Sequence, residues 1–171
     1  MKVEEIMSVD LETCRPEDTL NRAAQIMWEH DCGVVPVVDA ESRVVGMVTD
    51  RDICMAAYTQ GRSLSEISVS NACSRDVRTC ELSDTVEMAE SVMREAQIRR
   101  IPVVDAERKL YGIVSLADLA QCLEIPGRKV EGLSYQSVAS TMAAISQPSS
   151  DRSSIVPTRP QPTSRPQAGA H

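Results

Sequence analysis

The chain has 171 residues and a hydrophobic content of 42%, which suits one compact unit with a tail or two small units that share a core. Aromatic residues make up 2% and Phe is absent, so the core is expected to be aliphatic and base-stacking platforms for single-stranded nucleic acid are disfavoured. The net charge of −7 also disfavours nucleic-acid binding, because an acidic surface repels a phosphate backbone.

The sequence repeats itself at an offset of 66 residues without a gap. Thr13-Cys14 returns as Thr79-Cys80, and Pro-Val-Val-Asp-Ala-Glu at 36–41 returns unchanged at 102–107. A constant offset of this kind predicts two copies of one structural unit. Any site that one copy builds therefore has a pseudo-equivalent in the other.

Each copy is predicted to fold as β-α-β-β-α. A short extended segment precedes an amphipathic helix whose N-cap we assign to Asp18 or Asp84, and Asp84 with Glu87 resembles a capping box. Two apolar β-branched runs joined by five-residue hairpin connections follow, and a second helix begins at Asp50 and at Leu116. The extended segments are 11–14 and 77–80, and the apolar runs are 34–38, 44–49, 101–104 and 110–115.

The fold class is therefore mixed α+β: two β-α-β-β-α units packed through their sheets with pseudo-two-fold symmetry, since one unit is too small to bury its own sheet face. We assign 1–60 to the first unit, 61–124 to the second and 125–146 to an extension. Residues 134–146 of the extension are expected to form a short helix, and 147–171, rich in Pro, Ser and Arg, to be disordered. The helix should bury Leu133, Val138, Met142 and Ile145.

The segment 46–52, Gly-Met-Val-Thr-Asp-Arg-Asp, and its counterpart at 112–118 carry the most informative polar groups. Thr49 and Asp52 stand three residues apart at a helix N-terminus, where free N–H groups and the helix dipole favour an anion. A carboxylate can also accept both hydroxyls of a ribose. The same spacing describes a plain capping box, and repetition alone does not exclude that interpretation.

The repeated pattern h-P-V-V-D (h is apolar), followed by G-h-h-[TS]-x-x-D, resembles the cystathionine-β-synthase-type (CBS) domain pair, also called the Bateman module. The resemblance covers residues 1 to about 123 and is closest to the stand-alone bacterial type, which contains Thr-Asp-Arg-Asp-Ile, here Thr49–Ile53. It implies a non-catalytic regulatory homodimer with two clefts for adenosyl ligands: AMP, ADP, ATP, S-adenosylmethionine or a dinucleotide.

Carried over by position, the resemblance implies ribose-binding carboxylates at Asp52 and Asp118. It also implies phosphate-proximal hydroxyls at Thr49 and Ser115. The remaining implied contacts are with adenine: apolar walls at Val35, Pro36, Val37, Ile101, Pro102 and Val103, and base-edge contacts at Thr13 and Thr79.

The two copies differ where a phosphate would lie. Arg99 and Arg100 stand where the first copy has glycine and valine, and Arg51 stands where the second copy has Ala117. We hypothesise one tighter nucleotide cleft that uses Arg51 or the Arg99–Arg100 pair, and one weaker or vacant cleft. The alternative, equally open, is that these arginines are solvated or form a dimer salt bridge.

No nucleophile with a base, metal-ligand cluster or phosphate-binding glycine loop is recognisable, so neither an enzyme, a metal site nor a cofactor is expected. His30 is the only histidine besides His171. The six cysteines lack Cys-x-x-Cys spacing and are expected to be reduced, buried residues. Two alternatives stay open: a structural or partner-binding dimer with vestigial clefts, and a redox sensor acting through Cys14, Cys32 or Cys80.

No apolar run approaches the roughly 18 residues of a membrane span, and the first residues lack the apolar core of a signal peptide. We therefore expect a cytoplasmic protein without membrane contacts. Its partners are expected to be an adenosyl small molecule, a second copy of the chain and an unidentified protein effector.

Overall fold

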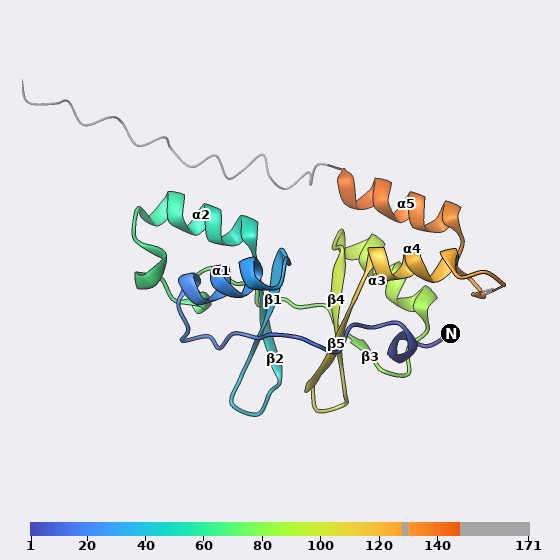
Figure 1. Ribbon diagram of the computed structural model, residues 1–171, viewed down its shortest axis with the longest axis horizontal. Helices are drawn as coiled ribbons and strands as arrows, with labels where there is room; N and C mark the ends of the chain where they lie inside the picture. Colours follow the sequence, from blue (N-terminus) through green and yellow to red (C-terminus); the bar gives the residue numbers. More distant parts are fainter. Residues whose placement is uncertain (128–129, 148–171) are drawn as a thin grey trace, which may run out of the picture.

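The computed structural model describes residues 1–127 and 130–147, so the disorder predicted for the tail falls outside the described residues beyond Gln147. Figure 1 shows helices α1 and α2 on one side, helices α3 to α5 on the other, and two β-hairpins side by side between them. The predicted mixed α+β class is confirmed. The helices are α1 (Leu20–Glu29), α2 (Asp50–Gln60), α3 (Val86–Ala96), α4 (Leu116–Glu124) and α5 (Tyr135–Ser146), with short 3-10 turns at Val3–Glu5, Leu64–Glu66 and Val69–Asn71.

Four strands follow the predicted apolar runs: β1 (Val34–Val38), β2 (Val44–Thr49), β4 (Arg100–Val104) and β5 (Leu110–Ser115). The fifth, β3 (Cys80–Glu81), overlaps the extended segment predicted at 77–80 only at Cys80. Strands β1 and β2 pair antiparallel, as do β4 and β5, while β3 runs parallel to β4. In the first unit, Cys14 forms a single parallel bridge to Val37 in the place of β3. Both hairpins carry a register shift at the same point, between Val37 and Val38 and between Val103 and Val104.

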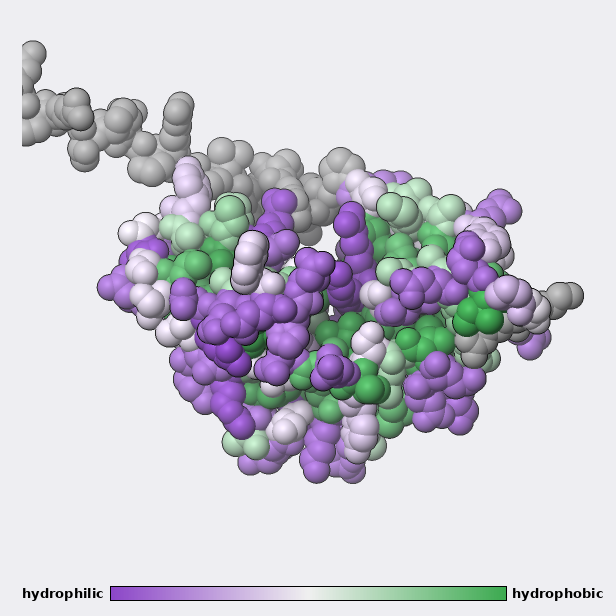
Figure 2. Space-filling model, viewed as in Figure 1, coloured by the Kyte–Doolittle hydropathy of each residue, from purple (hydrophilic) through white to green (hydrophobic). Residues whose placement is uncertain are grey.

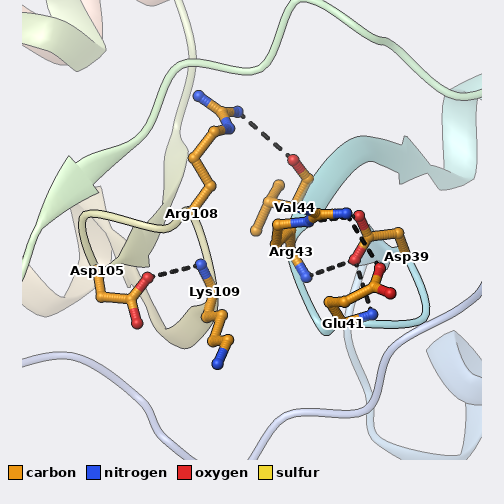
Figure 3. A network of polar contacts seen from close by, with 7 residues as sticks. All are labelled: Asp39, Glu41, Arg43, Val44, Asp105, Arg108 and Lys109. Atoms are coloured by element: carbon orange, nitrogen blue, oxygen red, sulfur yellow. Dashed lines mark hydrogen bonds and ion pairs between the residues drawn. The ribbon is translucent and has the colours of Figure 1, made fainter.

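The tips of the two hairpins hydrogen-bond to each other across the pseudo-two-fold axis, and Figure 3 shows one of these contacts, in which the Arg108 guanidinium donates to the Val44 carbonyl at 3.5 Å. Two backbone bonds also join the tips: the Val44 N–H donates to the Arg108 carbonyl at 2.9 Å, and the Leu110 N–H donates to the Ser42 carbonyl at 3.0 Å. Donors and acceptors are related by the same 66-residue offset, so the contact is symmetric. It joins the two sheets edge to edge.

The opening segment of each copy pairs with the sheet of the other copy. Ser8 and Ile113 exchange N–H···O bonds of 2.9 and 3.0 Å, and Ser74 and Met47 do the same at 2.9 and 3.0 Å. Val3 is fully buried in the core of the second unit. The assignment of 1–60 and 61–124 to separate units stays a prediction, but in space the first eight residues belong with the second sheet.

Two aliphatic cores lie under the sheets, one in each unit. Equivalent side chains fill them: Leu20 and Val86, Ala23 and Ala89, Met27 and Met93, Val37 and Val103, Ile53 and Leu119. The predicted periodicity of the first helix of each copy is thereby confirmed. On the face shown in Figure 2, hydrophilic residues predominate over the first unit, whereas hydrophobic residues are visible at the centre and over the second unit.

The predicted N-caps are wrong by one residue. Thr19 and Thr85 cap α1 and α3 through their hydroxyls, which accept from the N–H groups of Arg22 at 3.3 Å and Met88 at 3.2 Å. Asp18 instead closes the preceding turn by accepting from the Arg15 N–H at 2.7 Å. The capping box of Asp84 and Glu87 is therefore absent, since Asp84 accepts from the N–H of Glu81 at 2.8 Å.

The predicted C-terminal helix is present as α5, and it packs against α3 and α4. Leu133 is buried and Val138 and Ile145 pack on the second core, as expected. The prediction that Met142 is buried is wrong, because this residue is 57% exposed and Thr141 is buried instead. No helix within 1–127 and 130–147 has the length and apolarity to cross a membrane.

Candidate functional site

A cleft of about 780 Å³ lies where the two units meet. Figure 2 shows the molecule hollowed between its two halves. Both units, the segment that joins them and the end of α5 contribute to its walls. The lining residues are Gly33, Val34, Met47, Thr49, Asp50, Arg51, Ser74, Asp76, Val77, Arg78, Ala96, Gln97, Ile98, Arg99, Arg100, Pro102 and Ile145.

Five of the residues predicted for the site line this one cleft: Thr49, Arg51, Arg99, Arg100 and Pro102. Arg51 begins α2 in the first unit, whereas Arg99 and Arg100 lead into β4 of the second unit. The structure therefore brings together basic groups that stand about fifty positions apart in the chain. The sequence comparison of the two copies had singled out these same three arginines.

The cleft is basic although the protein is acidic. Four arginines line it, Arg51, Arg78, Arg99 and Arg100, against two aspartates, Asp50 and Asp76. Arg78 lies 4.0 Å from Asp76 and is exposed. Within the described residues, no carboxylate lies within 4.0 Å of the guanidinium groups of Arg51, Arg99 or Arg100. Uncompensated guanidinium groups of this kind suit a phosphate, which they can bind with two parallel hydrogen bonds.

Thr49 and Asp52 form a complete capping box at the start of α2. One carboxylate oxygen, Asp52 Oδ2, accepts from the Thr49 N–H at 2.9 Å and from its hydroxyl at 2.7 Å. Ser115 and Asp118 repeat the arrangement at the start of α4, with distances of 2.7 and 2.6 Å. The capping interpretation is thus confirmed for both pairs. It leaves the Oδ1 atoms of both aspartates without a hydrogen bond to the described residues.

The other predicted site residues lie outside the cleft lining. Val35, Val37, Ile101 and Val103 are at most 1% exposed and belong to the two cores. Pro36 is also buried. Thr13 and Thr79 are half-buried, and each precedes a cysteine that pairs in parallel with the first strand of a hairpin.

Ser115 and Asp118 are the counterparts of Thr49 and Asp52 in the second unit, and they do not line the cleft. Thr49 lines the cleft beside Asp52, which is half-buried at the helix start.

Two of the four arginines have no basic counterpart at the pseudo-equivalent position. At the 66-residue offset, Arg78 corresponds to Glu12 and Arg51 to Ala117. Glu12 is partly neutralised by Arg22, whose guanidinium lies 3.7 Å from it. A phosphate placed there would therefore meet a carboxylate in place of an arginine. This difference extends the inequality that the sequence predicted.

Twelve of the seventeen lining residues were absent from the predicted site, and three of them bear on ligand binding: Arg78, Gln97 and Ile145. Arg78 was detectable, because the offset comparison pairs it with Glu12. Gln97 ends α3 in a left-handed conformation with φ of 53°, and its position depends on that turn. Ile145 reaches the cleft only because α5 packs on α3, which no local pattern indicates.

Two of the three cysteines proposed as redox sensors, Cys14 and Cys80, are poorly suited to form thiolates, whereas Cys32 is half-buried. Burial, with a smaller contribution from Asp18, raises the pKa of Cys14 to about 11, and burial raises the pKa of Cys80 to about 12. Cys14 and Cys80 are 1% and 3% exposed and lie in different cores. A thiol that stays protonated and covered reacts slowly with oxidants. Residues 1–127 and 130–147 also contain no group of three or more His, Cys, Asp or Glu side chains arranged to hold a metal ion.

The family model of the CBS domain matches residues 3–58 and 66–125. The CBS domain-containing protein YhcV of Bacillus subtilis is 34% identical over 139 residues, which are 80% of this chain and 97% of that protein. Hypoxic response protein 1 of Mycobacterium tuberculosis is 33% identical over 119 residues, covering 70% and 82% of the two chains.

Solved structures of CBS domain pairs have the same fold. Hypoxic Response Protein I, determined with two coordinated zinc ions, superposes with a TM-score of 0.65 at 31% identity and covers 71% of this chain and 98% of its own. The CBS domain pair of protein MJ0100, in complex with 5-methylthioadenosine and S-adenosyl-L-methionine, gives a TM-score of 0.65 at 26% identity, with coverage of 72% and 96%. With both matched segments falling on the two structural units, this chain belongs to the CBS domain family and carries two CBS domains in tandem.

Proposed function

We propose that the protein is a non-catalytic, cytoplasmic regulatory module that binds an adenine nucleotide in the cleft between its two CBS domains. The observation that carries this proposal is the set of four arginines in a cleft of about 780 Å³ in an acidic protein. A cleft of this size suits a nucleotide-sized ligand. The MJ0100 pair, which binds S-adenosyl-L-methionine, supports an adenosyl group as the common part of the ligand.

The phosphates are proposed to lie between Arg51 of the first unit and the Arg99–Arg100 pair of the second. The ribose is proposed to bind at Asp52, whose Oδ1 has no hydrogen bond to the described residues while Oδ2 caps α2. One carboxylate can thus serve the helix and the ligand together. The excess of arginines favours AMP, ADP or ATP over S-adenosylmethionine, because the sulfonium of the latter is cationic.

The ligand proposal is tested by calorimetry and thermal unfolding with AMP, ADP, ATP, S-adenosylmethionine and NADH. A ligand at 100 times its Kd stabilises the folded state by about 2.7 kcal/mol. Arg99→Ala should weaken nucleotide binding about 10- to 100-fold, the equivalent of one charge-assisted hydrogen bond. Arg15→Ala is the matched control, because it removes the same charge from an exposed position outside the cleft.

If no adenosyl compound at millimolar concentration raises the unfolding temperature, the ligand proposal is contradicted. If Arg15→Ala and Arg99→Ala weaken nucleotide binding equally, the placement of the phosphates is contradicted, because the loss of affinity is then explained by the change in net charge alone. Nucleotide binding with unchanged affinity in Arg51→Ala and Arg99→Ala contradicts it as well.

We further propose that the module is a homodimer that pairs through the α1–α2 face. These two helices carry exposed large side chains: Trp28 of α1 is 89% exposed, and Tyr58 and Met55 of α2 are 60% and 41% exposed. On the second unit, α5 covers the equivalent part of α3 through Glu90 and Gln97, which flank the position equivalent to Trp28. The first unit has no such helix of its own within the described residues, so a second copy is the proposed cover.

The dimer proposal is tested by light scattering after size-exclusion chromatography. Trp28→Ala should shift the dimer towards monomer, whereas Tyr111→Ala, which removes a half-exposed aromatic ring from β5, should not. Trp28 is the only tryptophan, so its fluorescence should shift to longer wavelength on dilution. A dimer that survives Trp28→Ala with unchanged fluorescence on dilution contradicts the face proposed.

A further inference from the structure

Helix α5 belongs to neither repeat, yet its C-terminal end forms part of the cleft wall. The second of the two matched CBS segments ends at residue 125, whereas α5 spans Tyr135–Ser146. Figure 1 shows that its C-terminal end points towards the first unit. Ile145, in the last turn, lines the cleft together with Arg99 and Arg100. A ligand held by these arginines therefore lies against α5.

Gln97 connects α5 to the cleft. Its side-chain Nε2 donates a hydrogen bond of 2.9 Å to the carbonyl of Ala144 in the last turn of α5, a carbonyl that also accepts from the Gln147 N–H at 3.3 Å. Gln97 itself lines the cleft two residues before Arg99. Its backbone is left-handed, with φ of 53°, so the chain turns sharply between α3 and the two arginines. The contact thus joins the end of α5 to the segment that positions Arg99 and Arg100.

The rest of α5 is anchored on the second unit. The hydroxyl of Thr141 donates to Glu90 at 2.7 Å, and both side chains are almost fully buried. At the other end, the Tyr135 hydroxyl bonds to the carbonyl of Leu123 at 3.0 Å. The helix is short and mostly polar or small in composition, so its stability depends on this docking. A change in docking therefore changes whether α5 is formed.

We propose that α5 is a ligand-binding element of the cleft and that nucleotide binding and α5 docking stabilise each other. This inference rests on the proposed function. A nucleotide held by Arg99 and Arg100 contacts Ile145 and fixes the turn at Gln97, and both interactions exist only while α5 is docked. By linkage, undocking α5 weakens nucleotide binding by the same factor by which the nucleotide stabilises docking. The helix is then the part of the molecule that reports ligand occupancy to a partner.

The experiment measures hydrogen–deuterium exchange of residues 135–146 and the Kd of ATP in parallel. Saturating ATP should slow exchange in α5 of the full chain. Gln97→Gly removes the contact to Ala144 while relieving the left-handed backbone, so it should raise the Kd about 5-fold or more without lowering the unfolding temperature. Ile145→Ala should raise the Kd and also abolish part of the ATP-induced protection.

Two matched controls separate the contact from general effects. Asp31→Gly changes the equivalent position of the first unit, where φ is 47°, and within the described residues the Asp31 side chain forms no hydrogen bond or ion pair with α5. Met142→Ala shortens an exposed side chain of the same helix. Both controls should bind ATP at least as tightly as the unmodified chain.

The outcomes distinguish the two proposals. If ATP binds but exchange in 135–146 does not change and Gln97→Gly and Ile145→Ala bind normally, α5 is a bystander and only the ligand proposal survives. If no adenine nucleotide binds to the unmodified chain, both proposals are wrong. If the controls weaken binding as much as the two test variants, the coupling is not specific to the cleft wall and this inference is overturned.

Discussion

Asp52 and Thr49 hold each other through three hydrogen bonds: Asp52 Oδ2 accepts two, at 2.9 and 2.7 Å, and the Asp52 N–H donates one to Thr49 Oγ1 at 3.1 Å. The pair closes the N-terminus of α2 at the rim of the cleft. A residue proposed to bind the ribose therefore also stabilises a helix. Any variant of Asp52 must be assessed for stability and binding separately.

Asp52→Ala is expected to lower the free energy of unfolding by about 1 kcal/mol through loss of the cap. It should also weaken nucleotide binding by a further 10- to 100-fold through loss of a charge-assisted hydrogen bond. Chemical denaturation and calorimetry measure the two effects. Asp18→Ala is the control, because Asp18 closes a turn at 2.7 Å from the Arg15 N–H but lies outside the cleft. Equal binding by both variants would show that Asp52 is only a cap.

Thr141→Val is expected to lower the free energy of unfolding by about 1–3 kcal/mol, because it leaves the carboxyl group of Glu90 buried without its hydrogen-bond donor. The double variant Glu90→Leu with Thr141→Val should recover most of that loss, since both partners are then apolar. Urea denaturation of the four proteins gives the coupling free energy. Additive losses in the double variant would contradict a direct interaction between the two side chains.

Gly112→Ala should destabilise the fold by about 1–3 kcal/mol through overpacking. A Cβ at Gly112 would lie 2.6 Å from Sδ of Met7 and 2.9 Å from the carbonyl oxygen of Ser8. Gly46→Ala should cost less, because its closest contact is 3.0 Å, to Sγ of Cys73. Thermal unfolding ranks the two variants, and a greater loss for Gly46→Ala would contradict the packing described for the exchanged segments.

Stability is expected to fall as the pH rises above about 9. Folding raises the pKa of Cys14 to about 11 and that of Cys80 to about 12, both from an ordinary value of 9.0. Between these pH values the unfolded chain loses thiol protons that the folded chain retains, so deprotonation favours unfolding. The double variant Cys14→Ala with Cys80→Ala should show a shallower loss of stability from pH 9 to 11 than the unmodified chain. Parallel profiles would show that these thiols are not the cause.

The repeated elements were predictable because the two copies confirm each other. Helix α2 begins at Asp50 and α4 at Leu116, as expected, since a hydroxyl and a carboxylate three residues apart define a capping box. The other N-caps were missed because Asp and Thr are adjacent at 18–19 and 84–85, and both residue types cap helices. Only the local turn decides which of them does so.

The cleft was less predictable than the fold. Val35 and Val37 could not be separated from ligand-contacting positions because almost every residue of β1 is buried, so the strand shows no alternation between a core face and an open face. Gln97 and Ile145 depend on how α5 packs on α3, which is a long-range property of the folded chain. The arginines were found because charge differences between copies stand out against an otherwise conserved repeat pattern within the chain.

The exchange of opening segments makes neither half of the molecule self-sufficient. Met7 and Ser8 fill the groove over Gly112, and Cys73 and Ser74 fill the groove over Gly46. A fragment cut between the two copies would keep its own opening segment. The strand that normally pairs with the opening segment of the other copy would then be left uncovered. Two such fragments can complete each other only by reassembling as a pair. The main role of the linker between them is therefore to raise the effective concentration of each half for the other. Covalent linkage also frees the two copies from having to be identical, which is what allows Arg99 and Arg100 to face glycine and valine across the axis.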